Sequence, residues 1–137
     1  KQVSYVAVVA EVEVDARGQL RVARLVCAHD GGTVINPDQV RAQCEGNLVW
    51  GIGMVLTDGL DVADGQVSAA GFAEAPIPRI GQVPPMQVVL VQGADAPGGA
   101  GETAIVAAAA AIANAVRAAT GVRPTRFPLQ ARDFAQT

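Results

Sequence analysis

The chain has 137 residues, a length that fits one domain and disfavours a second independent core. Hydrophobic residues make up 50% of the sequence and charged residues 17%, so a surface this rich in Ala and Val is expected to be covered by something else. The formal net charge of -3 and the scattered Lys and Arg residues exclude a basic stripe for nucleic acid.

A hairpin and a helix are predicted in the first part of the chain. From Tyr5 to Asp15 apolar residues alternate with others, the period of two that suits a strand buried on one face. Asp15 to Gly18 supplies turn chemistry, and Leu20 to Cys27 is expected to return as the second strand. A loop from His29 to Val34 follows. Asn36 then fits an N-cap before a helix that runs from Pro37 to about Leu56.

The predicted helix carries two kinds of face. Gln43, Gly46, Asn47 and Trp50 share one face by offsets of three and four residues. Polar amides beside a glycine fit a ligand-binding face and a solvated face about equally well. Trp50 is expected to be a packing anchor, with an interdomain surface as one possible place for it. The several glycines of the helix predict close approach by another backbone or a ligand. The residues expected to face the core are Val40, Leu48, Ile52 and Val55.

The second half of the chain is predicted to add a small hairpin, a connector, two strands and a helix. The hairpin spans Leu60 to Ser68, and the prolines between Glu74 and Pro85 make that stretch an extended connector. A strand is expected from Met86 to Val91, a helix from Thr103 to Thr120, and a final strand from Arg123 to Leu129. The helix residues whose spacing predicts a core face are Ile105, Val106, Ala109, Ile112, Ala113 and Val116.

The order of these elements predicts an α+β fold, with two strands, helix, strand, helix and strand plus the inserted hairpin. We expect two layers, a mixed β-sheet with two main helices on one face, in a single domain over residues 1–137. No apolar run reaches the roughly 18 residues of a membrane-spanning helix, so no span is predicted. Because the chain begins at Lys1 directly before a strand-like run, it is expected to be a fragment of a longer subunit.

Cysteine and histidine are too sparse to form a disulfide scaffold or a metal cluster. Cys27 and Cys44 are therefore expected to be small buried hydrophobic residues. His29 is interpreted as a loop residue that forms hydrogen bonds, because no second His or Cys stands at ligand spacing. Any iron-sulfur cluster is expected to lie elsewhere.

A glycine-rich loop, Pro97 to Gly101, leads into the second helix at Glu102. The first amides of a helix lack partners and carry the positive end of its dipole, so an anion or oxo ligand fits there. The loop lacks the Lys-Ser/Thr and the glycine spacing of nucleotide-binding motifs. Taken alone, the loop favours Glu102 as an acid that complements the helix dipole. The alternative is a rigidly held general base.

Three segments together resemble the C-terminal cofactor-binding region of the molybdenum hydroxylases, the xanthine dehydrogenase and aldehyde oxidase family. The segments are Asp30 to Pro37, Gln43 to Gly46 together with Gly51 to Gly53, and Pro97 to Glu102, in matching order and separation. Within that family the sequence is most similar to the large, or beta, subunits of isoquinoline 1-oxidoreductase type. These share the pattern Ala-Pro-Gly-Gly-Xaa-Gly-Glu and the Ala-Asn-Ala found here at residues 113–115. The resemblance covers nearly the whole chain.

The resemblance implies a molybdopterin-dependent oxidoreductase that hydroxylates an N-heteroaromatic or aldehyde substrate with oxygen from water. It implies that Glu102 is the general base and that Gln43 forms a hydrogen bond with the cofactor. The backbone of Gly99, Ala100 and Gly101 would lie near the metal, with no metal ligand from this chain. The cofactor is expected in its cytosine dinucleotide form. The expected partners are the rest of the large subunit and a small subunit with iron-sulfur clusters.

Two positions depart from the family pattern. Asn47 stands where members often have glycine, which is expected to alter the cofactor face. Thr103 stands where many members have proline, which is expected to exchange one helix-start residue for another. A second hypothesis is a non-catalytic assembly or binding module that keeps the fold without cofactor. On either hypothesis the isolated fragment is expected to be inactive, and a cytoplasmic and a periplasmic location are equally open.

Overall fold

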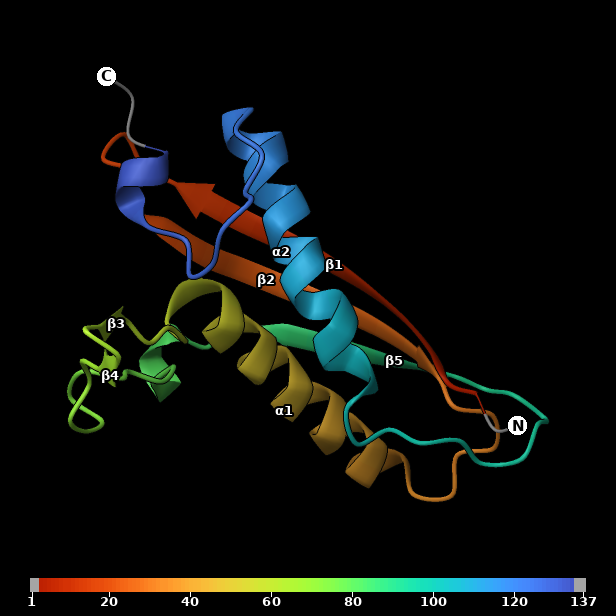
Figure 1. Cartoon of the computed structure of the whole chain (residues 1–137). Helices are drawn as coiled ribbons and strands as arrows, with labels where there is room; N and C mark the ends of the chain where they lie inside the picture. Colours follow the sequence, from red (N-terminus) through yellow and green to blue (C-terminus); the bar gives the residue numbers. More distant parts are fainter. Residues whose placement is uncertain (1–2, 135–137) are drawn as a thin grey trace.

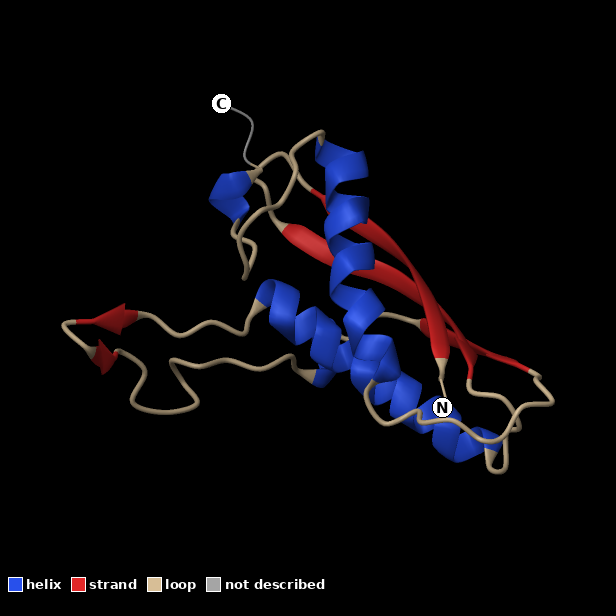
Figure 2. Cartoon of the chain, turned by 45° about the vertical axis from the view of Figure 1, so that its right-hand side comes forward, coloured by secondary structure: helices blue, strands red, loops and turns tan. Residues whose placement is uncertain are grey.

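A three-stranded sheet and two helices form the body of the structure, a computed structural model that describes residues 3–134 (Figure 1). The strands of the sheet are β1 (Tyr5–Val14), β2 (Leu20–Asp30) and β5 (Met86–Val91). The helices are α1 (Pro37–Leu56) and α2 (Thr103–Thr120), and both lie on the same face of the sheet (Figure 2). This two-layer α+β arrangement confirms the predicted fold class.

The sheet is mixed, as predicted, in the order β1-β2-β5. Strand β1 is antiparallel to β2, and β2 is parallel to β5. Along β1 the side chains of Val8 and Val12 pack toward the helices, whereas Val9 and Glu11 lie exposed on the opposite face. The predicted period of two is therefore confirmed. On the face away from the helices, the described chain leaves several apolar side chains of β1 and β5 exposed: Tyr5, Val9, Val89 and Val91.

Helix α1 begins at the predicted residue and packs closely against α2. The Asn36 side chain accepts a hydrogen bond from the Gln39 backbone N–H at 3.1 Å, and Pro37 opens the helix. A Cβ atom on Gly51 would lie 2.5 Å from the Cβ of Ala108 on α2, which is too close for any side chain. The predicted close approach of another backbone is confirmed at this position.

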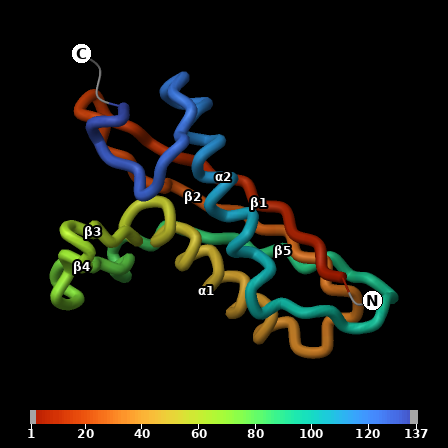
Figure 3. The backbone as a smooth tube through the Cα atoms, in the orientation of Figure 1, coloured from red at the N-terminus to blue at the C-terminus, as the bar shows by residue number. Residues whose placement is uncertain are grey.

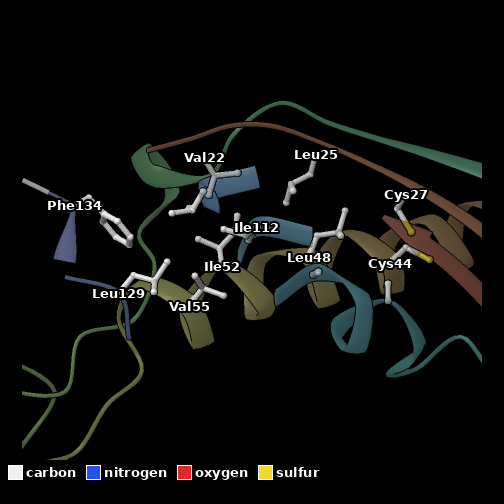
Figure 4. Packing of buried hydrophobic residues seen from close by; sticks show 13 residues of the cluster. Val22, Leu25, Cys27, Cys44, Leu48, Ile52, Val55, Ile112, Leu129 and Phe134 are labelled. Atoms are coloured by element: carbon white, nitrogen blue, oxygen red, sulfur yellow. The ribbon is translucent and has the colours of Figure 1, made fainter. Parts of the chain in front are cut away.

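The core fills the space between the sheet and the two helices (Figure 4). On α2 the buried residues recur at every fourth position, from Ala104 to Val116. The prediction that Val106 faces the core is wrong, because two residues rotate a helix by roughly 200° and turn it away from Ala104. The cysteines are buried as predicted. The core residues are Val22, Leu25, Cys27, Cys44, Leu48, Ile52, Val55, Ala104, Ala108, Ile112, Val116, Leu129 and Phe134.

The predicted final strand from Arg123 to Leu129 is wrong, because this segment is a loop that ends in a short 3-10 turn, Ala131–Asp133. Pro124 and Pro128 have no backbone N–H to donate to a sheet. The Leu129 N–H instead donates to the Val55 carbonyl oxygen at the end of α1, at 2.7 Å. Leu129 and Phe134 are buried there, so the segment closes one end of the core without joining the sheet.

The inserted hairpin, β3 (Val62–Ala63) and β4 (Gln66–Val67), is shorter than predicted and lies on long loops away from the body (Figure 2). Its turn residues Asp64 and Gly65 have φ angles of 51° and 77°, as the predicted turn type requires. The connector that follows is extended as predicted, apart from a 3-10 turn at Ile80–Gln82.

The hydropathy of helix α2 differs from the sequence expectation that no segment could span a membrane. By length and composition it is apolar enough to cross a membrane, although the sequence patterns predict no such run. In the structure it packs on β1 and α1, and soluble core helices pass the same criterion. The finding is weak support for a membrane span.

Candidate functional site

The glycine-rich loop before α2 is held against two other parts of the chain (Figure 3). The Gly98 N–H donates to the Gly31 carbonyl oxygen at 2.7 Å, just after β2. The Ser4 hydroxyl donates to the Gly99 carbonyl oxygen, also at 2.7 Å. A Cβ atom on Gly98 would lie 2.5 Å from the Ser4 oxygen, so only glycine allows this contact. The segment from β2 to α1 and the start of β1 therefore fix the path of the loop.

Glu102 lies exposed at the end of this loop, in the N-cap position of α2. Its side chain forms no capping hydrogen bond with the helix that it precedes. The loop beside it is open, since a Cβ atom on Gly99 or Gly101 would meet no described atom within 4 Å. Glu102 thus does not act as the side-chain cap of α2, although its charge still lies at the favourable end of the helix dipole.

The structure brings Gln43 next to this loop. The Gln43 side chain is exposed on α1, and a Cβ atom on neighbouring Gly46 would meet nothing within 4 Å. The side-chain nitrogen of Asn47 donates to the carbonyl oxygens of both Gln43 and Gly101, at 2.6 and 2.8 Å. One amide group therefore joins the two segments that were predicted to bind the cofactor.

Asn47 itself does not lie where the sequence predicted. It was expected on the exposed face with Gln43 and Trp50, but only 4% of its surface is exposed. Its offsets of three from Cys44 and four from Gly51 place it on the buried stripe of α1. The same offsets in the sequence could have predicted that Asn47 is buried. Trp50 is 54% exposed, so it anchors no packing within the described chain.

The loop location predicted for His29 is also wrong, because β2 continues past Cys27 and includes it, whereas its predicted hydrogen bonding is confirmed. Its ring is buried under the start of α2, where Nε2 shares a 3.0 Å hydrogen bond with the Thr103 hydroxyl. The Nδ1 atom has no partner among residues 3–134. Thr103 is therefore more than a substitute helix-start residue, since it connects α2 to the sheet.

Two cavities lie near the ends of α1. A cavity of about 170 Å³ separates the start of α1 from the loop and is lined by residues that include His29, Asn36 and Ala100. This volume is below the roughly 300 Å³ of typical ligand pockets. A larger cavity of about 500 Å³, lined by Thr57 and Phe72 among others, contains none of the predicted site residues. Ala100 thus lines the smaller cavity, whereas Gln43 and Glu102 lie on the exposed surface beside the loop.

The groups at this surface suit hydrogen bonding to a polar ligand. Among residues 3–134, no group of three or more His, Cys, Asp or Glu side chains could hold a metal ion. Three groups could bind a ligand here: the side-chain amide of Gln43, the uncovered backbone from Gly99 to Gly101 and the carboxylate of Glu102. Amide and backbone groups of this kind bind polar organic cofactors through hydrogen bonds.

Comparison with known proteins identifies the family of the chain. Residues 1–84 match the family model described as the molybdopterin cofactor-binding domain. The chain belongs to this family. The resemblance inferred from the sequence motifs is thereby confirmed. The matched part contains α1 with Gln43 and ends before the loop that carries Glu102.

The sequence similarity to known relatives covers the loop that carries Glu102 as well. The chain is 36% identical over 93% of its length to a nicotinate dehydrogenase subunit from Pseudomonas putida, and it spans 11% of that protein. It is 34% identical over 93% of its length to the beta subunit of isoquinoline 1-oxidoreductase from Brevundimonas diminuta, of which it spans 16%. The aldehyde oxidoreductase structure from Desulfovibrio gigas matches 96% of this chain with a TM-score of 0.84 and 32% identity, over 15% of that protein. The names of these three proteins describe dehydrogenases or oxidoreductases, and two of the three are named as subunits.

Proposed function

We propose that the chain forms the cofactor-binding part of a molybdenum hydroxylase large subunit, as a single C-terminal domain over residues 1–137. The substrate would be an N-heteroaromatic compound or an aldehyde, and the added oxygen would come from water. Family membership supports this proposal, as do relatives named for nicotinate, isoquinoline and aldehydes. An iron-sulfur small subunit would accept the two electrons that the substrate loses.

The residues of this chain fit the proposed cofactor. When bound, the molybdenum cofactor would supply the two-electron redox chemistry of the hydroxylation. The Gln43 side chain and the backbone of Gly99, Ala100 and Gly101 would hold it by hydrogen bonds. We expect the cytosine dinucleotide form, whose additional phosphate and base would need residues beyond Gln43 and the loop.

The proposed role of Glu102 is that of general base. The carboxylate would take up the proton that is released when a water-derived oxygen is added to an electron-poor carbon of the substrate. The observation that carries this role is the exposed Glu102 side chain, free of the helix cap, on a main chain held by hydrogen bonds on both sides. The main chain at Glu102 therefore keeps its position, while the side chain remains open to a substrate.

The test is Glu102→Gln in the assembled, cofactor-loaded protein, with turnover and molybdenum content measured together. Nicotinate, isoquinoline and benzaldehyde serve as substrates with a dye as electron acceptor. A general base contributes roughly 100- to 10,000-fold, so kcat should fall by at least about 100-fold while molybdenum content stays normal. Glu13→Gln, an exposed carboxylate at the far end of β1, is the control and should keep normal turnover.

Two outcomes would contradict the proposal. Normal turnover of the Glu102→Gln protein at normal molybdenum content would refute the role of base. Wild-type protein that binds no molybdopterin would favour the alternative, a non-catalytic module that keeps the fold without cofactor.

A further inference from the structure

Asn47 is one of two buried polar residues among residues 3–134. Both the nitrogen and the oxygen of its side-chain amide form hydrogen bonds. Its nitrogen donates to the carbonyl oxygens of Gln43 and Gly101, and its oxygen accepts from the Ile105 N–H at 3.1 Å. Both partners of the nitrogen are acceptors and the partner of the oxygen is a donor, so only one orientation of the amide satisfies all three bonds. A buried amide satisfied in this way defines one arrangement of the groups around it.

The bonds of Asn47 bracket Glu102. Gly101 directly precedes Glu102, and Ile105 is the third residue of the helix that follows it. In an ordinary helix, the N-cap side chain itself accepts from the N–H of the second or third residue. Here Asn47 provides that acceptor from another helix. One unpaired N–H group of the first turn, that of Ile105, is thereby satisfied without the carboxylate of Glu102.

Capping of α2 and uptake of a proton are thus assigned to two different residues, Asn47 and Glu102. A carboxylate that caps its own helix is stabilised in its charged form, which makes it a weaker base, and its oxygens are turned toward the backbone. We propose that Asn47 is a positioning residue that caps α2 from α1, and thereby leaves the Glu102 carboxylate free on a main chain that is fixed in place. This inference rests on the proposed role of Glu102 as the base.

The packing of the two helices makes this contact possible. Gly51 lies one turn after Asn47 on α1, and Ala108 lies one turn after Ile105 on α2. Because Gly51 has no side chain, α1 approaches Ala108 closely enough for the short Asn47 side chain to reach the first turn of α2. On the opposite side, the bond between His29 and Thr103 connects the same turn to β2.

The test uses Asn47→Ala in the assembled, cofactor-loaded protein, with two measurements. Hydrogen exchange of residues 99–106 should become faster, since Ile105 loses its acceptor and Gly101 its donor. The kcat for nicotinate, isoquinoline or benzaldehyde should fall by between roughly ten- and a hundredfold, the cost of a misplaced catalytic group, with little change in KM. Asn114→Ala, an exposed asparagine on α2, is the control and should change neither.

A double-variant comparison separates positioning from general destabilisation. If Asn47 acts through Glu102, Asn47→Ala should lower kcat in the wild-type background but add nothing to Glu102→Gln. An equal loss in both backgrounds, or unchanged exchange of residues 99–106, would overturn the inference. If instead Glu102→Gln alone has normal turnover, the proposed function fails before Asn47 is tested.

A second variant separates the two ends of the Asn47 contact. Asn47→Asp keeps the size and the acceptor for Ile105, but it turns an oxygen toward the carbonyl oxygens of Gly101 and Gln43, where Asn47 supplies a donor. It should leave the Ile105 amide protected and still lower kcat, because the Gly101 end of the loop is released. Normal kcat in this variant would also overturn the inference.

Discussion

The ring of His29 and the hydroxyl of Thr103 are 74 positions apart in the sequence and 3.0 Å apart in the fold. The bond joins a buried residue of the central strand to the first residue of α2, directly after Glu102. On the other side of the same turn, Asn47 bonds to Gly101 and Ile105. The main chain around Glu102 is thus held by the sheet and by α1 at once.

Replacing Thr103 by Val should weaken this connection. The variant keeps the shape of the side chain but leaves the Nε2 atom of His29 without its partner. An unsatisfied buried polar group costs about 1–3 kcal/mol, so the free energy of opening at the first turn of α2 should fall by that amount. Hydrogen exchange measures this directly. Thr125→Val in the exposed C-terminal loop is the matched control, and equal protection in the two variants would contradict the prediction.

Two glycines of α1 should respond in opposite ways to the same substitution. Gly51→Ala places a methyl group 2.5 Å from Ala108, and such overpacking costs about 1–3 kcal/mol. Gly46→Ala meets open space and should gain about 0.5–1 kcal/mol from better helix propensity. The measurement is the free energy of opening of α1 by hydrogen exchange. Similar changes at both positions would show that the helices do not approach as closely as described.

The elements of the fold were predictable where their signals are local. The alternation in β1, the Asn36 cap of α1 and the four-residue spacing in α2 each act over a few neighbouring residues. The strand predicted from Arg123 to Leu129 is wrong because Leu129 is buried at the end of α1, where its N–H donates to the distant Val55 carbonyl oxygen instead of to a neighbouring strand. Two prolines in that segment were the available signal against a strand.

The site was only half predictable. Sequence motifs identified Gln43 and the loop to Glu102 as candidates, but not the group that joins them. The bond between Asn47 and Gly101 spans 54 positions, and the bond between His29 and Thr103 spans 74. Contacts at such separations depend on how two helices cross, and a single sequence carries no direct record of that geometry.

The buried thiol of Cys27 should make stability fall in alkaline solution. Burial first, and then the neighbouring Cys44, raise the pKa of Cys27 from its usual 9.0 to about 12. Between these two values the unfolded chain loses the thiol proton while the folded chain keeps it. Stability from this group is therefore complete below pH 9 and falls, by at most about 1.4 kcal/mol per pH unit, as the pH rises toward 12.

The measurement is the pH dependence of the opening free energy of β2 in wild type and in Cys27→Val. The difference between the two proteins removes the titration of the shared groups that do not interact with Cys27; Cys44 interacts with it and stays in the difference. Wild type should lose stability more steeply above pH 9 than the variant. Parallel pH profiles would show that the thiol titrates normally in the folded protein.

The exposed side chain of Gln43 should matter for the cofactor and not for the fold. Its backbone carbonyl accepts a bond from Asn47, which any residue at this position would preserve. Gln43→Ala removes only the exposed amide, and one or two lost hydrogen bonds of about 0.5–1.5 kcal/mol each should weaken cofactor retention by roughly two- to a hundredfold. Molybdenum and released pterin per protein after gel filtration measure the retention. Gln66→Ala on the distant small hairpin is the control, and unfolding should be unchanged in both. Full cofactor content in Gln43→Ala would show that this amide does not bind the cofactor. The backbone of residues 99–101 would then be the remaining candidate contact.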